Sequence, residues 1–453
     1  MLRRTLVAGA LCVALSPGAA KAQELAGPGD LAAFIPTFFG PHGLDLQTGI
    51  PHFAHFESQA LTNIGAFNTA FASQLTALPV PSPASGFTYT YDPKAGIFKR
   101  STQSFGPILA DRSETIGKNR VSFGFSYQHF EFDSLGGVTL NQLPIVFQHA
   151  SFTINGVFPA FEQDVVSTMS SISAKLEQVT PALTYGITDR LDVAVAVPIV
   201  RVDLAMSSTA TIVRFGTGPN DTNTHFFGDH ASSQSYSLQD KTAAGVGDVL
   251  VRLKGSILHQ DANGLAVGVE GRLPTGAARN LLGSGALGIE PFLVYSYANK
   301  SVAPHVKVAY QWNGKSILGG TSTAQIDPTT HRVTGLIYNE ASLPKQLLYA
   351  VGADLGVTDR VTLAFDLLGR RVQNGPRLQS ATFVRQSDLL PNQGPLPDVQ
   401  VVPNANFFVN EVAAGLKFNP TGKLLVDLNV LVSLDHNGLH HKVAPLVGIE
   451  YGF

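Results

Sequence analysis

The last eleven residues of the chain, Val443 to Phe453, place an apolar or bulky side chain at every second position. The intervening positions hold mainly small or polar residues, among them Gly448 and Glu450. Because a β-strand presents successive side chains to opposite faces, this segment predicts a strand with one apolar face and one small or polar face. Such a strand needs an apolar environment along one whole face, which limits the folds open to the chain.

The same alternation recurs from residue 121 onward. In each segment an apolar row is opposed by small or polar residues, and the segments are about ten residues long, as in a lipid-facing barrel wall. The apolar rows lie in Val121–Tyr127, Leu191–Ile199, Val249–Leu253, Val302–Trp312, Val361–Leu367 and Leu424–Val432.

The N-terminus has the organisation of a secretory signal peptide. Met1–Arg4 is short and basic, Thr5–Leu15 is apolar, and Ala20–Ala22 forms a small-residue cleavage site. We therefore predict that residues 1–22 are removed. Their removal would take away the only cysteine, Cys12, so no disulfide or thiol chemistry is expected of the mature chain.

Composition narrows the class of protein further. Only 14% of residues are charged, yet no stretch beyond the N-terminal one approaches the roughly 18 apolar residues of a transmembrane helix. The bilayer can otherwise be spanned only by a closed barrel. Composition alone favours a soluble periplasmic β protein, but the alternation of apolar and polar residues favours the membrane barrel. The formal net charge of −2 and the lack of a basic block argue against nucleic acid as a partner.

The connections between the alternating segments also alternate in length. Short turns occur at 187–190, 259–264, 299–301, 357–360 and 419–422, and longer links near 135–164, 215–242, 274–284, 313–343, 381–405 and 436–441. Outer-membrane barrels have short periplasmic turns and long external loops. Counting back from Phe453 predicts an all-β fold, an antiparallel up-and-down transmembrane barrel of about twelve strands over residues 119–453.

Residues 23–118 are predicted to form a partly helical plug or periplasmic segment. Glu57–Leu78 carries apolar residues at three- and four-residue steps, which is typical of a helix. A helical pattern gives a face but no location, so a lumen plug and a small periplasmic or surface helix both stay open. About twelve strands enclose more than the eight that side chains fill and fewer than the sixteen or so of an open channel, so a narrow or plugged lumen is expected.

The inward-facing positions predict which residues line the lumen. Charged residues there could form a selectivity constriction, although paired charges that brace the wall are the favoured interpretation. These residues are Asp248, Arg252, Lys254, Glu270, Arg272, Glu290 and Lys307. The apolar inward positions would contact a plug or an apolar substrate, and they include Leu250, Phe292, Val294, Leu425, Leu431 and Leu446.

Two turns are near-copies, Tyr185–Arg190 (YGITDR) and Leu355–Arg360 (LGVTDR). We interpret their Thr and Asp as hairpin residues that bond the local backbone rather than as a ligand site.

No motif supports catalysis, and no cofactor or metal is expected. His149-Ala150-Ser151 lies in a predicted external loop without a flanking motif, and a nucleophile and base need a third orienting group. His436, His440 and His441 lack the spacing of a metal site.

Two resemblances add to this reading. The terminal strand resembles the one by which outer-membrane barrels are recognised and assembled, which would make Val447, Ile449, Tyr451 and Phe453 an assembly signal.

Four segments resemble, in order, the transporter-like outer-membrane barrel family of the MetA pathway of phenol degradation. They are Ser104–Asp133, Tyr185–Pro198, Gly245–Leu258 and Val269–Pro291, and the similarity covers most of 104–453. This resemblance implies an outer-membrane barrel that passes small, often aromatic or apolar compounds, and it supplies no catalytic residues.

The sequence thus predicts a channel in the outer membrane for passive uptake of small hydrophobic or aromatic compounds. Its expected partners are outer-membrane lipid, the barrel-assembly machinery and those compounds. The alternatives are a general small-solute porin and a structural or surface-display barrel without transport.

Overall fold

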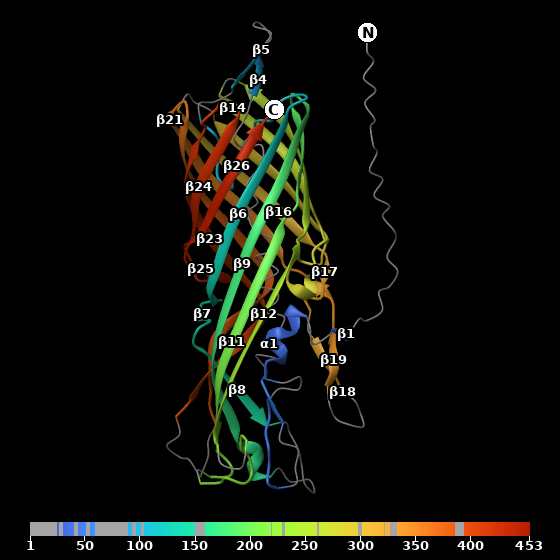
Figure 1. Cartoon of the computed structure of the whole chain (residues 1–453), viewed down its shortest axis with the longest axis vertical. Coiled ribbons are helices and arrows are strands. Elements are labelled where there is room, and N and C mark those ends of the chain that lie inside the picture. Colours follow the sequence, from blue (N-terminus) through green and yellow to red (C-terminus); the bar gives the residue numbers. More distant parts are fainter. Residues whose placement is uncertain are drawn as a thin grey trace.

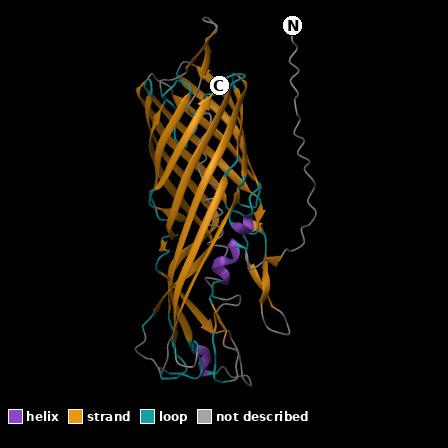
Figure 2. Cartoon of the chain, viewed as in Figure 1, coloured by secondary structure: helices purple, strands orange, loops and turns teal. Residues whose placement is uncertain are grey.

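A computed structural model of the chain describes residues 25–26, 30–39, 44–50, 55–58, 89–92, 97–100, 104–149, 159–218, 220–228, 232–260, 262–297, 301–320, 322–326, 333–385 and 394–453. Within these ranges nearly all regular structure is β-strand, and each helical element has three or four residues (Figure 2). The all-β fold class is confirmed. The predicted signal peptide and, apart from Glu57 and Ser58, the predicted helix over 57–78 lie outside the described residues.

Twelve wall strands close into an antiparallel barrel, as the alternation predicts (Figure 1). Two of these strands are interrupted, one between β10 and β11 and one between β12 and β13. In chain order the wall consists of β6 (Val121–Leu135), β9 (Val165–Thr188), β10 (Leu191–Ala196) with β11 (Ile199–Val213), β12 (Gln234–Val246) with β13 (Val249–Gln260), β14 (Asn263–Leu273), β15 (Gly288–Tyr297), β16 (Val302–Asn313), β21 (Lys345–Thr358), β22 (Val361–Phe383), β23 (Leu396–Phe418), β24 (Leu424–Ser433) and β26 (Ala444–Gly452).

The remaining elements are short. The strands among them are β1 (Leu25–Ala26), β2 (Leu44–Asp45), β3 (His55–Glu57), β4 (Tyr89–Asp92), β5 (Ile97–Arg100), β7 (Val138–Thr139), β8 (Leu143–His149), β17 (Lys315–Ser316), β18 (Ser322–Ile326), β19 (Val333–Tyr338), β20 (Ala341–Ser342) and β25 (Leu439–His441). The helical elements are η1 (Leu31–Ala33), α1 (Phe34–Thr37), η2 (Ala160–Gln163) and η3 (Ala278–Asn280).

The barrel closes between its first and last wall strands. β26 pairs with β6 from Leu446 opposite Gln128 to Gly452 opposite Ser122, so the ladder continues around the wall. The short turns and the C-terminus lie at one end of the barrel, the upper end in Figure 1, which we call the turn end. The longer connections lie at the other end, which we call the loop end.

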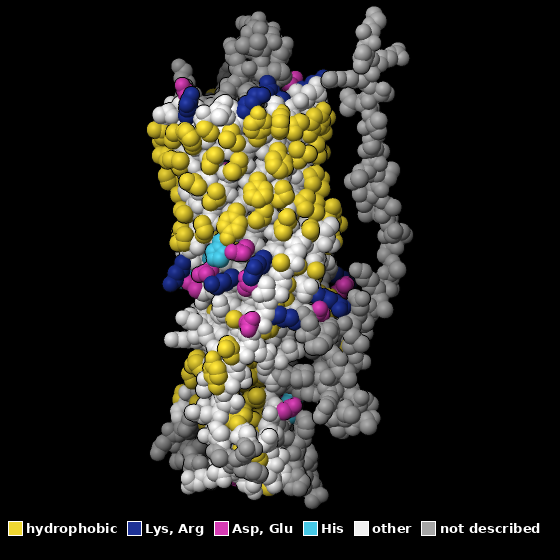
Figure 3. Space-filling view, in the orientation of Figure 1, with side chains coloured by type: hydrophobic (Ala, Val, Ile, Leu, Met, Phe, Trp, Pro, Cys, Tyr) yellow, Lys and Arg dark blue, Asp and Glu magenta, His cyan; other side chains and the backbone are white. Residues whose placement is uncertain are grey.

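Burial follows the two-residue period of the sequence. β15 alternates strictly between buried and exposed positions, and β26 does so from Ala444 to Tyr451. The outward positions carry large apolar side chains, which form a belt next to the turn end (Figure 3). Such a belt suits contact with lipid hydrocarbon.

A row of outward-facing charges limits the belt on its loop side, where Figure 3 shows a band of charged side chains. Glu131 of β6 pairs in register with Lys175 of β9, and Lys175 with Asp203 of β11. The Lys175 ammonium lies 2.8 Å from the Glu131 carboxylate, and Arg201 lies 3.0 Å from Asp203. We call this the charged row.

Several wall strands continue far beyond the charged row. β9 has 24 residues and β22 and β23 have 23 each, although about ten residues suffice to cross a bilayer. The links expected near 215–242 and 381–405 are therefore partly wrong, because β12 begins at Gln234 and β23 at Leu396. The inward faces of these strands stay buried beyond the charged row, as at Val166, Ile172 and Met206 in the main apolar core.

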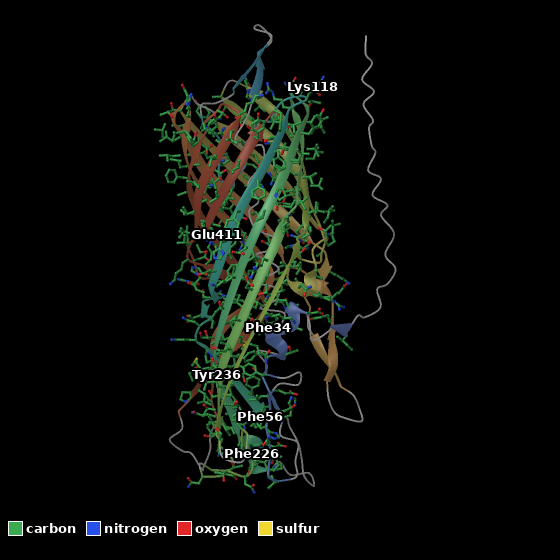
Figure 4. The ribbon with its side chains drawn as sticks, viewed as in Figure 1. Phe34, Phe56, Lys118, Phe226, Tyr236 and Glu411 are labelled. Carbon is green, nitrogen blue, oxygen red and sulfur yellow. The ribbon has the colours of Figure 1, made fainter. Side chains whose placement is uncertain are left out.

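The wall has one seam near the charged row. β12 pairs with β11 along one edge, and no described strand pairs with its other edge. The segment 30–39, with η1 and α1, packs beside that edge and against η3. Its residues Leu31 and Phe34 are buried in the main apolar core, and Figure 4 labels Phe34 next to the wall.

Among the described residues, no helix is long and apolar enough to span a membrane.

Candidate functional site in the barrel lumen

A segment without regular structure, Ser104–Ile116, lies inside the barrel, and we call it the strap. All of its residues are buried. Its first backbone anchor is Phe105 N, which donates to Thr362 Oγ1 over 2.9 Å, and its last is Ile116 N, which donates to Asp192 over 3.0 Å. Both anchors lie near turns, and Lys118, which follows the strap, is labelled at the turn end in Figure 4. The strap therefore dips into the lumen from the turn end.

One carboxylate holds the middle of the strap. Oδ2 of Asp366 accepts from the backbone N–H groups of Ile108, Leu109 and Ala110, at 2.8, 3.0 and 3.3 Å. Because a buried backbone N–H without an acceptor is costly, this triple acceptor fixes the strap where it has no strand partner. A Cβ at Gly352 would lie 2.2 Å from Oδ1 of Asp366, so only glycine leaves room for this carboxylate.

A second buried group links the strap to β16 and β21. Nε and Nη2 of Arg112 donate to Oδ2 of Asp354 at 3.1 and 2.6 Å. The His305 ring lies between two acids, with Nδ1 3.7 Å from Asp354 and Nε2 2.8 Å from Oδ1 of Asp366. Strap and wall thus share one connected polar network, in which buried charges face opposite charges.

The charges predicted to line the lumen meet the strap through Asp111. Its carboxylate lies 2.8 Å from Arg252 and 3.0 Å from Lys307. Arg252 also lies 2.6 Å from Glu270, and Lys307 lies 3.3 Å from Glu290. The charges form pairs across neighbouring strands and with the strap.

The two other predicted bases have separate roles. Nζ of Lys254 donates to the backbone carbonyls of Arg112 and Glu114 over 3.1 and 2.7 Å. Arg272 lies 3.4 Å from Asp248, and its Nη2 donates to Oδ1 of Asn313 over 2.9 Å. Lys254 therefore holds the strap, while Arg272 stands apart from it.

A cavity of about 130 Å³ lies in the lumen beside the strap, with Leu109 in its lining. Six of the seven predicted charges line it, all except Lys254. Its other charged lining residues are Arg370 and Glu411, and Figure 4 shows Glu411 away from both ends of the barrel. The apolar part of the lining includes Val200, Leu250, Leu282, Leu348, Leu368 and Val409.

The apolar residues predicted for the lumen are divided between the cavity and the packing. Leu250 lines the cavity. Leu425 packs on Phe105 of the strap, and Leu431 and Leu446 belong to the main core. Val294 packs in a cluster with Phe292, whose ring lies 4.8 Å from the Lys307 ammonium.

The terminal strand presents its predicted assembly residues outward. Val447, Ile449, Tyr451 and Phe453 are all exposed, and the Tyr451 and Phe453 rings lie 4.7 Å apart. The backbone N–H of Phe453 donates to Val121 O over 2.9 Å. These residues lie on the apolar belt, and their role in assembly stays a prediction.

The duplicated turns bond their own backbone. Oγ1 of Thr188 accepts from Arg190 N over 3.1 Å, and Oγ1 of Thr358 accepts from Arg360 N over 3.2 Å. The interpretation of the two Thr residues as turn formers is confirmed, whereas Oδ1 of Asp189 accepts from Lys118 N over 3.1 Å, outside its own turn.

The histidines examined for catalysis or metal binding pack with other groups. His149 is buried near the loop end, 5.0 Å from the Phe56 ring, while Ala150 and Ser151 lie outside the described residues. Nδ1 of His440 lies 2.5 Å from Asp133. In the described part of the chain, no group of histidines, cysteines and acids has the arrangement of a metal site.

Sequence reasoning did not single out Asp354, Asp366 or Asp192 as site residues, nor the strap residues Asp111 and Arg112. The wall residues among them share the inward parity of the predicted charges, and that parity is the signal that could have found them. The strap has no periodicity and offered no such signal.

The sequence matches no known family model, and no curated protein is significantly similar to it. Solved structures with a partial likeness include an outer membrane channel from Pseudomonas putida F1, at 12% identity over 76% of this chain and 99% of that chain with a TM-score of 0.41. The Ralstonia pickettii toluene transporter TbuX matches at 11% identity over 83% and 100% of the two chains, with a TM-score of 0.36. A Pseudomonas aeruginosa FadL homologue matches at 11% identity over 82% and 96%, with a TM-score of 0.32. Likenesses this remote assign no family or function, so the resemblance to the MetA-pathway barrel family stays a prediction.

Proposed function

We propose that the chain is an outer-membrane channel through which small apolar or aromatic compounds diffuse passively. The observation that carries this proposal is the lumen cavity of about 130 Å³, whose lining includes seven Leu and Val side chains. An engineered apolar cavity of about 150 Å³ holds benzene, so a compound the size of one aromatic ring suits this space. The strap, buried inside the barrel, would obstruct the aqueous path of a general porin.

The proposed location follows from the apolar belt and the terminal strand. The signal peptide would export the chain, the assembly machinery would recognise Val447–Phe453, and lipid would cover the belt. The turn end would face the periplasm, because short turns do so in outer-membrane barrels. A compound would then approach from the loop end and reach the cavity before it meets the strap.

The strap separates the cavity from the turn end in this proposal. Passage therefore requires the strap to shift, and Asp366 and Asp111 are the groups that resist the shift. Selectivity would come from the size of the cavity and from its mixed apolar and charged lining.

Uptake in a deletion strain tests the proposal. Toluene and arabinose would each be supplied at limiting concentration, with the gene restored in a control strain. We expect slower toluene uptake without the protein and unchanged arabinose uptake. Equal slowing of both solutes, with steady conductance in planar bilayers, would establish a general porin instead. If neither solute slows, the transport proposal fails and a surface-display role remains.

A further inference from the structure

Arg272 has two buried donor atoms, Nε and Nη1, that no described residue satisfies with a hydrogen bond. Its side chain is 3% exposed and lines the lumen cavity. Nη2 donates to Asn313 Oδ1 over 2.9 Å, and Nε lies 3.4 Å from Asp248. Nη1 is buried and has no hydrogen-bond partner in the described part of the chain. A buried guanidinium nitrogen without an acceptor is costly, so this atom indicates a missing acceptor.

The nearest acid, Asp248, is already engaged elsewhere. Its carboxylate accepts from Gly276 N at 3.1 Å and from N and Oγ of Ser284 at 2.8 and 2.5 Å. These bonds fix the connection between β14 and β15. The carboxylate is therefore directed at that connection, and its closest oxygen stays beyond ordinary hydrogen-bond length from Nε of Arg272.

Arg252, the adjacent lumen arginine, has the acidic hydrogen-bond partners that Arg272 lacks. Nε of Arg252 donates to Glu270 over 2.8 Å, and Nη1 donates to Asp111 over 2.8 Å. Arg252 thus has an acid on two sides, one from the wall and one from the strap. Arg272 lines the cavity, and its Nη1 has no such partner among the described residues.

The rest of the cavity defines the ligand that could supply the acceptor. Leu250, Leu282 and Leu348 give it an apolar side, and its volume suits one aromatic ring. The lining carries equal numbers of acids and bases, so no formal excess of negative charge repels an anion. The acids are Asp248, Glu270, Glu290 and Glu411, and the bases are Arg252, Arg272, Lys307 and Arg370.

We propose that the cavity binds a ring compound bearing one carboxylate, with the carboxylate on Nη1 of Arg272 and the ring against the apolar lining. A carboxylate fits better than a neutral acceptor, because hydrogen bonds between opposite charges are roughly twice as strong as neutral ones. This inference rests on the proposed function and narrows its substrate class to aromatic acids.

Binding to the purified full-length protein in detergent, measured by calorimetry near neutral pH, tests the inference. Benzoate, benzamide and toluene share the ring but differ in the head group. We expect benzoate to bind about tenfold more tightly than benzamide, which offers a neutral acceptor. If benzoate has no advantage over benzamide, Nη1 is merely hydrated and the inference is wrong.

The variant Arg272→Met assigns the effect to one residue. It keeps the length of the side chain and removes the donors, so benzoate affinity should fall to that of benzamide while toluene affinity stays unchanged. Arg201→Met on the outer wall, where Arg201 pairs with Asp203, is the matched control and should change neither. An equal loss for all three probes would mean a structural role for Arg272 and would overturn the inference.

Heat-modifiable gel migration shows whether each variant forms the barrel. If Arg272→Met does not form the barrel, the comparison of benzoate with benzamide on the unmodified protein tests the inference. Failure of this inference is distinguishable from failure of the proposed function. If toluene uptake depends on the protein but benzoate binding does not depend on Arg272, only this inference fails. If benzoate binding depends on Arg272 but toluene uptake does not depend on the protein, the proposed function fails.

Discussion

His441 shows how a single buried side chain outside the apolar belt makes stability depend on pH. It pairs with Phe132 of β6, one residue beyond Glu131 of the charged row, so it lies on the loop side of the belt. Burial, assisted by the charges of His440 and Arg370, lowers the pKa of His441 from 6.5 to about 4. The unfolded chain therefore binds a proton that the folded chain refuses as the pH falls from about 6.5 to about 4.

Replacing this histidine with Phe should remove part of the acid sensitivity. Phe keeps the ring contacts to Phe130 and Phe132, at 5.1 and 6.4 Å between centroids, and it cannot be protonated. Between pH 7.5 and pH 4 the unmodified protein should lose roughly 3 kcal/mol more unfolding free energy than His441→Phe. Guanidinium unfolding in lipid vesicles at both pH values measures the difference. Parallel losses in the two proteins would contradict the role of His441.

The strap is the element on which the closure of the lumen depends. Its backbone N–H groups at Ile108, Leu109 and Ala110 all donate to Asp366. Asp366→Ala leaves these donors and the His305 ring without their acceptor, at a cost of about 1–3 kcal/mol for each buried donor. The strap should then leave its position part of the time, while the wall ladders hold the barrel.

We therefore expect Asp366→Ala to raise single-channel conductance in planar bilayers, with frequent transitions between closed and open levels. The control is Asp203→Ala, which removes an acid from the outer wall and leaves the strap untouched. Both variants should keep heat-modifiable migration. A conductance for Asp366→Ala equal to that of the control would show that Asp366 does not hold the strap.

The sequence could predict the wall strands but not the strap, because only the wall strands follow a local pattern. A wall residue such as Phe125 or Val308 alternates with inward neighbours, so its environment follows from positions two residues away. The strap hydrogen-bonds to wall side chains 76 to 310 residues away, and no local pattern encodes such partners. The same parity gave the lumen charges but not their pairing, because Asp111 comes from the strap.

For the whole molecule, the length of the strands does not show which part of the barrel wall the bilayer surrounds. The barrel extends well beyond its apolar belt (Figure 3). Exposed aromatic residues occur both inside and outside that belt. Phe125 lies on β6 between the turn end and Glu131, and it is 45% exposed. Tyr236 lies on β12, six residues beyond Thr242, which pairs in register with Asp203 of the charged row, and it is 66% exposed.

This pair of aromatics tests where the bilayer surrounds the barrel. An arginine on the lipid face costs about 2–4 kcal/mol at the bilayer midplane and about 0–1 kcal/mol near its edges. Phe125→Arg should therefore destabilise the barrel in vesicles by about 2–4 kcal/mol, whereas Tyr236→Arg should have little effect because water surrounds that part of β12. Unfolding in guanidinium, starting from vesicles, measures both variants. Equal costs at the two positions would mean that lipid also covers the long strands beyond the charged row, and the cavity would then lie deeper in the bilayer than the belt implies.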